Sequence, residues 1–526
     1  MKTQSDFKVL LVYPNLSLMK IPSLAIALFT AILKNQGYIV DLFDASSYIR
    51  DKEGHDDRRI GSFQYRRLDK RLLNWNVKTD LVGDFIRKVS EFSPDIIIMS
   101  VVEDTFNQGV ELLDAIKHLG IPNLIGGVFP TMSPEEAIEP ECVQMVGIGE
   151  GEITIVKVCE NIRNNISCEN IFNLWFKRND GTVIKNRLDK LVDINKTIPD
   201  YSLFEEDKFL RPWGGKIYKS LAIESMRGCP YECTFCNSPM HNKLARQAGE
   251  VSFVREKDTG ALRKEIKSLT KYIQPEFFMF VDDTFLTRPG KLFHEWHEMY
   301  SEFKIPFWMN TRIEAITSEK LKMLKEVGCA RISFSLEHGN EEFRKKYLKK
   351  YFSNEIFIKN ANIAGESGIP FSIDVLIGLP FETRELIFDT IKIIRQVRNY
   401  DALTVNIFTP YRGTELREVV IQKGWLDRYK FPNGISGSSI LSMDPDYLQN
   451  DEISGLFRTF TFYAYFAKEK WDQIKRAEIN DEEGNRVFNE LGKEYYQEKF
   501  GNEETIFYSK KYSRGTGCRA PEDSSI

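Results

Sequence analysis

Short apolar runs alternate with amphipathic stretches along the first part of the chain. The run KVLLVY at residues 8–13 stops at Pro14-Asn15 and predicts a buried strand followed by a loop. Comparable runs predict four more strands, at residues 38–43, 95–101, 123–126 and 144–148. Apolar residues at helical spacing predict helices at residues 26–36, 80–91 and 107–119. This alternation is typical of a doubly wound α/β sheet of the flavodoxin type, with its ligand crevice at the carboxyl ends of the strands.

Two stretches interrupt this alternation. Charged residues are frequent at positions 51–70 and predict an excursion on the surface. The turn Asn179-Asp180-Gly181 lies between the runs LWFKR and TVIKN and predicts a hairpin, which we expect to bridge to a second domain.

Strand and helix signals alternate again beyond residue 200. Six apolar runs predict strands at residues 221–225, 277–281, 307–310, 331–335, 371–377 and 403–408. Helical periodicity lies between them, for example at residues 318–327 and 382–398. Six such units without a reversal of strand order predict a partial (βα)6 barrel of the TIM type, which places chemistry at the carboxyl ends of its strands.

The end of the chain differs from both of these regions. Aromatic residues at helical spacing from about residue 444 predict packing helices, and the tail after Tyr512 predicts disorder. We therefore expect a flavodoxin-type domain at 1–172, a hairpin linker at 173–200, the partial barrel at 201–430, and a helical region with a disordered tail at 431–526.

Composition adds exclusions to this picture. The net charge of −4, from 72 basic and 76 acidic residues, offers no basic field for nucleic acid. The longest apolar stretch, residues 21–33, is too short to span a membrane and does not resemble a signal peptide. We expect a cytoplasmic protein whose eight cysteines are thiols or metal ligands rather than a disulfide framework.

Three cysteines carry the strongest chemical signal in the chain. Cys229, Cys233 and Cys236 follow the first barrel strand with the spacing C-x3-C-x2-C, where a loop can direct all three thiolates to one centre. An iron–sulfur cubane normally takes four thiolates, so three leave one iron open. The alternative, a zinc site, would need a fourth ligand nearby, and His241 lacks a usual spacing. The remaining cysteines show no paired spacing and are expected as buried thiols: Cys142, Cys159, Cys168, Cys329 and Cys518.

The cysteine motif resembles that of the radical S-adenosylmethionine (SAM) superfamily. It reads C-x3-C-x-φ-C, with the aromatic Phe235 at the φ position, after the first strand of a six-unit barrel. The resemblance implies that the three cysteines hold a [4Fe-4S] cluster whose open iron chelates the amino and carboxylate groups of SAM. An electron donor such as flavodoxin or ferredoxin would drive cleavage of SAM to methionine and a 5′-deoxyadenosyl radical, which abstracts a substrate hydrogen.

Polar residues at the ends of later barrel strands fit the same resemblance. Asp282 and Asp283 end the second strand, where family members hold the SAM ammonium group. Arg312, after the third strand, could meet a carboxylate, and Glu337, after the fourth, resembles the family's ribose-binding position. Gly378 begins GLPFET, which resembles a signature of one branch, and would let the backbone approach the adenine. The alternative for the charged residues is that they pair with one another or face solvent.

Other candidate motifs give no site. His294 and His297 lie in HEWHE, which is not H-E-x-x-H, and a solvated helix face is the expected reading. No Walker loop occurs, and no G-x-G-x-x-G follows a strand, so nucleotide binding in those modes is not indicated.

Glycine-rich turns in the first domain resemble those of the cobalamin-binding branch of this superfamily. They are Gly126-Gly127, followed by VFPT, and Gly149-Glu150-Gly151. The resemblance implies cobalamin in the crevice of the first sheet, contacted by Thr105, Gly126, Gly127 and Gly149. D-x-H-x-x-G is absent from this chain, so we expect no histidine ligand from the loop that begins at Tyr13. The alternative is a vestigial sheet that only packs on the barrel.

The resemblance implies a cobalamin-dependent radical SAM enzyme that methylates an unactivated carbon through the 5′-deoxyadenosyl radical and methylcobalamin. The substrate would be a small molecule, such as a natural product or a lipid-like compound, between the two domains. Tyr411 and Arg412, near the sixth strand, could contact an anionic or aromatic ligand or simply form a turn. Two alternatives remain: a radical cyclisation, oxidation or rearrangement without methyl transfer, and a cobalamin-binding regulatory protein.

Overall fold

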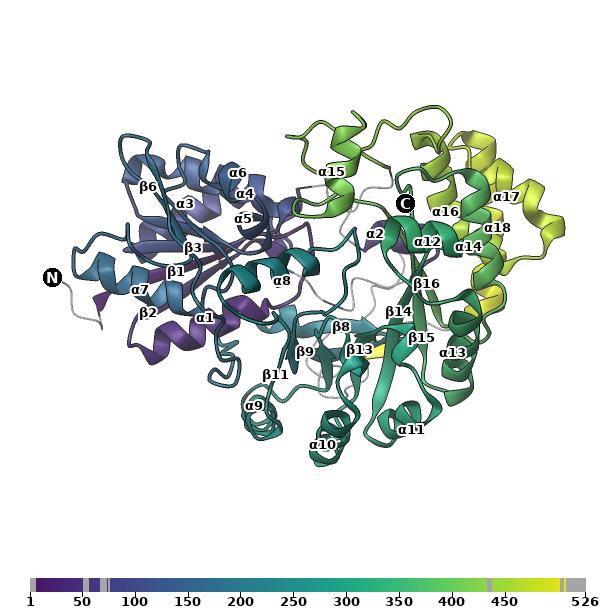
Figure 1. Ribbon diagram of the computed structural model, residues 1–526, viewed down its shortest axis with the longest axis horizontal. Helices are drawn as coiled ribbons and strands as arrows, with labels where there is room; N and C mark the ends of the chain where they lie inside the picture. The colour runs from purple at the N-terminus through teal and green to yellow at the C-terminus, as the bar shows by residue number, and fades with distance from the viewer. Residues whose placement is uncertain are drawn as a thin grey trace, which may run out of the picture.

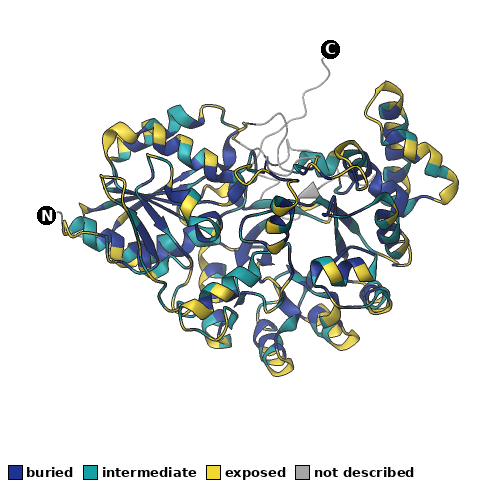
Figure 2. Ribbon diagram, turned by 45° about the horizontal axis from the view of Figure 1, so that its top comes forward, coloured by how far each residue is buried: buried dark blue, intermediate teal, exposed yellow. Residues whose placement is uncertain are grey.

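The computed structural model describes residues 6–50, 56–66, 73, 76–432, 438–501 and 506–507. Two sheets lie side by side, the first at the left of Figure 1 and the second at the lower right. Their strands are the most deeply buried elements, whereas the outer faces of the surrounding helices are exposed (Figure 2). No helix in these ranges combines the length and the apolarity needed to cross a bilayer.

The first sheet has the strand order β2-β1-β3-β4-β5-β6-β7. Its parallel strands match the predicted ones almost residue for residue: β1 (Lys8–Tyr13), β2 (Ile39–Asp44), β3 (Ile96–Ser100), β4 (Asn123–Gly126) and β5 (Met145–Gly147). The predicted hairpin, β6 (Leu174–Lys177) and β7 (Val183–Lys185), pairs antiparallel with β5. It therefore extends the first sheet instead of bridging to the second domain.

Helices cover both faces of this sheet. They are α1 (Leu24–Asn35), α3 (Leu81–Phe92), α4 (Glu103–Ala115), α5 (Val128–Met132), α6 (Pro134–Ile138) and α7 (Glu152–Arg163). Helix α4 begins at Glu103, before the predicted start at residue 107. The Thr105 hydroxyl accepts a hydrogen bond from the Val102 amide at 3.1 Å and so caps the helix, which is why the helix begins earlier than predicted.

The second sheet is a partial barrel of six parallel strands. They are β9 (Lys216–Ile223), β12 (Phe277–Phe280), β13 (Phe307–Thr311), β14 (Cys329–Glu337), β15 (Phe371–Ile377) and β16 (Ala402–Ile407), in that order. Strands β8 (Leu210–Trp213) and β17 (Ile506–Phe507) flank β9. In the described ranges β16 does not pair with β9, so the barrel stays open on that side.

Helices connect the barrel strands and complete the chain. The connecting helices are α8 (Ser238–Gln247), α9 (Thr259–Tyr272), α10 (Gly290–Tyr300), α11 (Ser318–Glu326), α12 (Glu341–Leu348), α13 (Asn354–Ser367), α14 (Arg384–Ile394) and α15 (Glu415–Gln422). The last helices are α16 (Asn450–Tyr465), α17 (Trp471–Ala477) and α18 (Glu482–Phe500). They pack beside α14 and β16, at the right of Figure 1, and the tail predicted to be disordered lies outside the described residues.

The predicted surface excursion has a different place. Its residues 56–66, which we call the inserted segment, contain α2 (Asp57–Gly61) and lie against the open side of the barrel (Figure 1). The Gln64 side chain accepts a hydrogen bond from the Val405 amide of β16 at 2.8 Å. The Phe63 ring packs against Phe462 and Phe488, with centroids 5.4 and 5.5 Å apart. Ser62, Phe63 and Gln64 are buried because they complete the barrel edge, so this part of the predicted excursion is not on the surface.

Candidate active site

The three cysteines lie in one loop at the carboxyl end of β9. This cluster loop, residues 228–238, follows the short strand β10 (Met226–Arg227) and leads into α8. The Asn242 side chain donates to the Cys229 carbonyl at 2.8 Å, and the Cys236 amide donates to the Cys233 carbonyl at 3.2 Å. Gly228 has φ +96°, and a Cβ there would lie 2.8 Å from the Phe253 ring. Only glycine fits this entry to the loop.

The thiols of the loop have the chemistry that a metal cluster needs. All three are free, and burial raises the pKa of Cys229 to about 12, with Asp283, Cys233 and Cys236 adding to the shift. Thiolates so close together in a buried place require positive charge, which an iron–sulfur cluster supplies. His241 stacks on the Phe253 ring, with a centroid distance of 4.9 Å. Three free thiols in one loop are a donor set that an iron–sulfur cluster can use.

Arg312 lies directly beside the cluster loop. Its Nη1 donates to the Cys233 Sγ at 3.6 Å, its Nη2 pairs with Glu314 at 2.6 Å, and its guanidinium stacks 3.7 Å from the Tyr231 ring centre. We expected Arg312 to meet a carboxylate. In the structure it contacts the Glu314 carboxylate of its own chain and the sulfur of Cys233. Phe235, at the aromatic position of the motif, is half-buried and packs against the barrel core.

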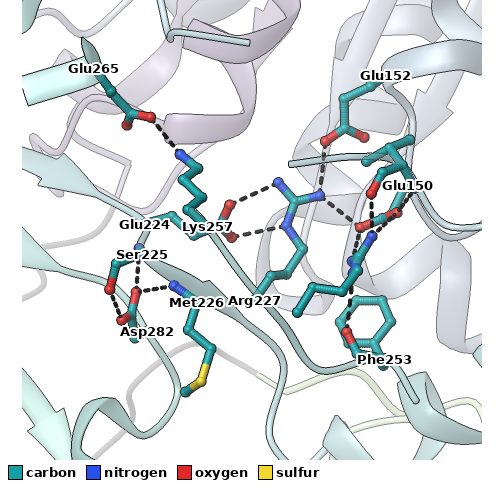
Figure 3. Close-up of polar contacts among 12 residues, drawn as sticks. Glu150, Glu152, Glu224, Ser225, Met226, Arg227, Phe253, Lys257, Glu265 and Asp282 are labelled. Carbon is teal, nitrogen blue, oxygen red and sulfur yellow. Dashed lines mark hydrogen bonds and ion pairs between the residues drawn. The ribbon is translucent and has the colours of Figure 1, made fainter. Parts of the chain in front are cut away.

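The two adjacent aspartates after β12 have opposite environments. Asp282 is 2% exposed and accepts from the amides of Ser225 and Met226 at 2.7 and 3.0 Å (Figure 3). It also pairs with Arg288 at 2.9 Å. It fixes the chain just before the cluster loop. Asp283 instead faces the cavity between the domains, where burial, Asp282 and Glu224 raise its pKa to about 6.

The later strand ends are held by their own contacts. Glu337 has φ +61°, a strained conformation for a residue with a side chain, and pairs with Lys350 at 3.2 Å. The amides of Gly378 and Leu379 donate to one Glu382 oxygen at 2.6 and 3.1 Å, so Glu382 ties the GLPFET turn together. The Gly378 amide is occupied by this contact.

A cavity of about 500 Å³ lies between the first sheet and the cluster loop, and we call it the interdomain cavity. Its first-domain wall contains Gly126, Gly127 and Gly149, and its barrel wall contains Cys236 and Asp283. The structure thus brings together Cys236 of the cysteine motif and all three predicted glycines. Thr105 is engaged in the cap of α4 described above.

The glycines leave this wall open. Gly127 has φ +114°, and a Cβ there would lie 2.3 Å from the Val101 carbonyl oxygen, so the turn needs glycine. A Cβ at Gly149 would meet nothing within 4 Å, and one at Gly126 would first meet an atom at 3.9 Å. Bare backbone with the neighbouring Leu28 and Phe29 makes a smooth, largely apolar surface. This surface suits a large flat macrocycle such as a corrin.

Charged groups join the two domains beside the interdomain cavity. Arg227, next to the cluster loop, donates to Glu150 at 2.7 Å and to Glu152 at 2.9 Å from the first domain (Figure 3). It also forms a bidentate pair with Glu224 at 2.9 and 3.0 Å, while Arg255 donates to Glu150 at 3.0 Å. Burial alone would raise the pKa of Glu150, but Arg255 and Arg227 lower it below its ordinary value. We call these residues the charge clamp.

A second contact between the domains explains Tyr411 and Arg412. The Arg412 guanidinium donates to Glu136 at 2.7 and 2.6 Å and also pairs with Glu103, and the Tyr411 hydroxyl donates to Asp104 at 3.0 Å. These side chains bind the first domain and not a free ligand. Sequence reasoning missed their partners because more than 270 positions separate each pair.

The remaining candidates behave as ordinary structural residues. His297 on α10 lies 3.4 Å from Glu326, and the helix carries no metal arrangement in the part of the chain that the structure describes. Cys159, Cys168 and Cys329 are buried in the core, Cys142 is half-buried, and Cys518 lies outside the described residues.

Two family models match the chain, one for each domain. The radical SAM superfamily model matches residues 223–394, and the B12 binding domain model matches residues 17–158. The chain carries a B12 binding domain followed by a radical SAM domain. This radical SAM protein is therefore an enzyme whose cofactors are a [4Fe-4S] cluster, SAM and cobalamin.

Relatives of this radical SAM enzyme carry different names. An uncharacterized methyltransferase of Pyrococcus horikoshii is 24% identical over 65% of this chain and 73% of its own length. An anaerobic magnesium-protoporphyrin IX monomethyl ester cyclase of Rubrivivax gelatinosus is 23% identical over 74% of this chain and 69% of its own. The solved structure of OxsB, a cobalamin-dependent SAM radical enzyme with aqua-cobalamin and SAM bound, shares the fold, with a TM-score of 0.63 and 16% identity over 94% of this chain and 72% of OxsB.

Proposed function

We propose that this enzyme methylates an unactivated carbon of a small molecule. The observation that carries the proposal is the interdomain cavity, because one wall is the glycine-rich face of the B12-binding domain and the other contains Cys236 of the cluster loop. A corrin on the first wall would face the SAM site on the second. When bound, these cofactors supply a carbon-centred radical and a transferable methyl group. Holding both beside one substrate is the proximity contribution of the two domains.

Residues of this chain have separate roles in the proposal. Cys229, Cys233 and Cys236 hold the cluster, and Asp283, whose carboxylate faces the cavity, holds the SAM ammonium group. Glu337 accepts from the ribose hydroxyls, and the turn at Gly378 lies beside the adenine. Gly126, Gly127 and Gly149 line the corrin. The electron donor would be a flavodoxin or a ferredoxin.

The experiment is anaerobic reconstitution with iron, sulfide and hydroxocobalamin, followed by incubation with SAM and a reductant. Corrin absorbance, 5′-deoxyadenosine and S-adenosylhomocysteine are measured, and the Cys229, Cys233, Cys236→Ala variant is the control. Bound corrin with both SAM products, and loss of deoxyadenosine in the control, would support methyl transfer.

A second candidate is a radical reaction without methyl transfer. The observation that favours it is the similarity to the cyclase, which extends over 74% of this chain. Deoxyadenosine without S-adenosylhomocysteine would select this candidate. Absence of deoxyadenosine would leave only a regulatory role for the cofactors.

A further inference from the structure

A second cavity, of about 540 Å³, lies inside the partial barrel. We call it the barrel cavity. Its wall includes side chains from five parallel strands, among them Trp308, Asn310, Arg331, Ser333, Asp374 and Asn406. Most of these residues are polar, which is unusual for a barrel interior that only packs. The cavity as a whole combines a largely apolar surface with several polar groups, as binding sites for small molecules commonly do.

Two segments outside the barrel strands close this cavity. The inserted segment contributes Arg59 and Tyr65, and the β8–β9 hairpin contributes Arg211 and Trp213. Tyr65 lies close enough to both arginines to interact with each of them electrostatically. Arg59 and Arg211 thus lie at the same part of the wall.

The guanidinium groups of the barrel cavity are not equivalent. Arg331 and Arg66 share one carboxylate partner, Asp401. Arg59 donates only to neutral groups, the Tyr65 hydroxyl and the Asn406 side chain, each at 2.6 Å. Among the residues that the structure describes, neither Arg59 nor Arg211 has a carboxylate within ion-pair distance, and the Nε of each is buried without a hydrogen-bond partner. Burial also lowers the pKa of Arg211, although Asp56 lies close enough to oppose this.

The barrel cavity adjoins the proposed SAM site. Val281 belongs to the walls of both the barrel cavity and the interdomain cavity. Asp374 lies in the barrel cavity wall, and Glu337 and Lys350 both act on its carboxyl electrostatically. The same two residues act on Cys233 of the cluster loop. A molecule in the barrel cavity would therefore lie next to the place where SAM is cleaved.

We propose that the barrel cavity is the substrate pocket and takes a small molecule with an anionic oxygen group, a carboxylate or a phosphate, bound by Arg59 and Arg211. The claim that the bound molecule is the substrate rests on the proposed function, but the anion site itself does not depend on it. In the described part of the chain neither guanidinium has a carboxylate within ion-pair distance, although Asp374 acts on Arg59 and Asp56 acts on Arg211 electrostatically. An anionic ligand would add charge-assisted hydrogen bonds to both. The inserted segment thereby makes the first domain part of the substrate pocket.

Calorimetric titration of the full-length, reconstituted enzyme tests this site with three probes: phenyl phosphate, benzoate and uncharged phenol. We expect one of the anions to bind at least about tenfold more tightly than phenol. Arg59→Gln and Arg211→Gln should each remove most of that preference, whereas Arg59→Lys should retain part of it. Arg66→Gln is the matched control, because it removes a cavity guanidinium that is paired with Asp401, and it should change affinity less than about twofold.

The order of phenyl phosphate and benzoate distinguishes a phosphate pocket from a carboxylate pocket, and either order supports the proposal. Failure of both anions to bind, a preference that survives in both glutamine variants, or an equal loss in Arg66→Gln would overturn it. Should Arg211→Gln not fold, the Arg59→Gln and Arg59→Lys pair decides alone. Anion binding without S-adenosylhomocysteine formation would reject methyl transfer and retain the pocket, so the two proposals fail separately.

Discussion

At the scale of the residue, the neighbouring aspartates Asp282 and Asp283 differ in the groups that surround their carboxylates. Asp282 is enclosed by Ser225, Met226 and Arg288, so its charge is used within the fold. Asp283 faces the interdomain cavity and keeps its carboxylate available. The sequence places both after one strand but cannot separate them, because the partners of Asp282 come from another strand end.

Asp283→Asn is expected to weaken SAM binding roughly tenfold or more, because it removes the charged acceptor for the ammonium group. Since its pKa is about 6, SAM affinity of the unsubstituted enzyme should also fall as the pH decreases through 6. Equilibrium dialysis of SAM against pH measures both effects. An unchanged affinity, or a flat pH profile shared with the variant, would contradict the role.

The raised pKa of Asp283 also predicts that removing its charge stabilises the fold while it weakens SAM binding. These opposite directions provide a control. The folded-state pKa of Asp283 is raised, so its ionised form destabilises the fold above pH 6, and this cost disappears as the pH falls toward the ordinary carboxyl value. Asp283→Asn should therefore raise the melting temperature near neutral pH and have little effect in acid. A variant that loses SAM binding and becomes less stable would have lost its fold.

Arg312→Gln is expected to lower the reduction potential of the cluster by tens of millivolts. The Arg312 guanidinium donates to the Cys233 sulfur and places positive charge beside it, which favours the more negative reduced state. Redox titration followed by electron paramagnetic resonance measures the change, and Arg312→Lys should recover part of it. An unchanged potential would show that the contact is structural only.

At the scale of the element, the charge clamp holds the turn between β5 and α7 against the cluster loop. Glu150→Gln is expected to lower the free energy of unfolding by about 1–3 kcal/mol, since Arg227 and Arg255 lose a buried carboxylate. Glu169→Gln is the matched control, because its bidentate pair with Arg178 is exposed and should contribute much less to stability. Urea denaturation compares the two variants, and equal effects would contradict the prediction.

The same clamp has a defined pH dependence. The pKa of Glu150 is lowered in the fold, so its stabilising contribution is complete above the ordinary glutamate pKa and is lost as the pH falls through the lowered value. The stability difference between Glu150→Gln and the unsubstituted enzyme should therefore shrink in acid. A difference that stays constant down to acid pH would exclude an electrostatic origin.

Strands were predictable from the sequence because both sheets are buried on two faces, so apolar runs such as residues 8–13 and 371–377 mark them directly. The cysteine loop and the glycine turns were predictable because each depends on local backbone shape. The hairpin at β6 and β7 and the start of α4 were misplaced, since sheet pairing and a cap at Thr105 decided them. Arg59, Arg211 and Glu150 could not be found, because their roles arise from contacts between distant segments.

At the scale of the whole molecule, the inserted segment joins all three regions of the fold. Phe63→Ala is expected to destabilise the enzyme by about 3–5 kcal/mol, because the ring packs between Phe462 and Phe488. It should also speed hydrogen exchange of the Val405 amide, which donates a hydrogen bond to the Gln64 side chain. Amides in the middle of the barrel, such as those of β14, should remain protected. Hydrogen-exchange mass spectrometry measures both, and unchanged exchange in β16 would show that the segment does not cover the barrel edge.

The separation of these partners along the chain sets an order of events during synthesis. Gln64 and Val405 are 341 positions apart, so at about 5–20 residues per second the segment leaves the ribosome roughly 17–70 s before its partner strand exists. Phe63 must wait longer still, until Phe488 has been made. The inserted segment is therefore among the first parts of the enzyme to be translated and among the last to reach its final structure.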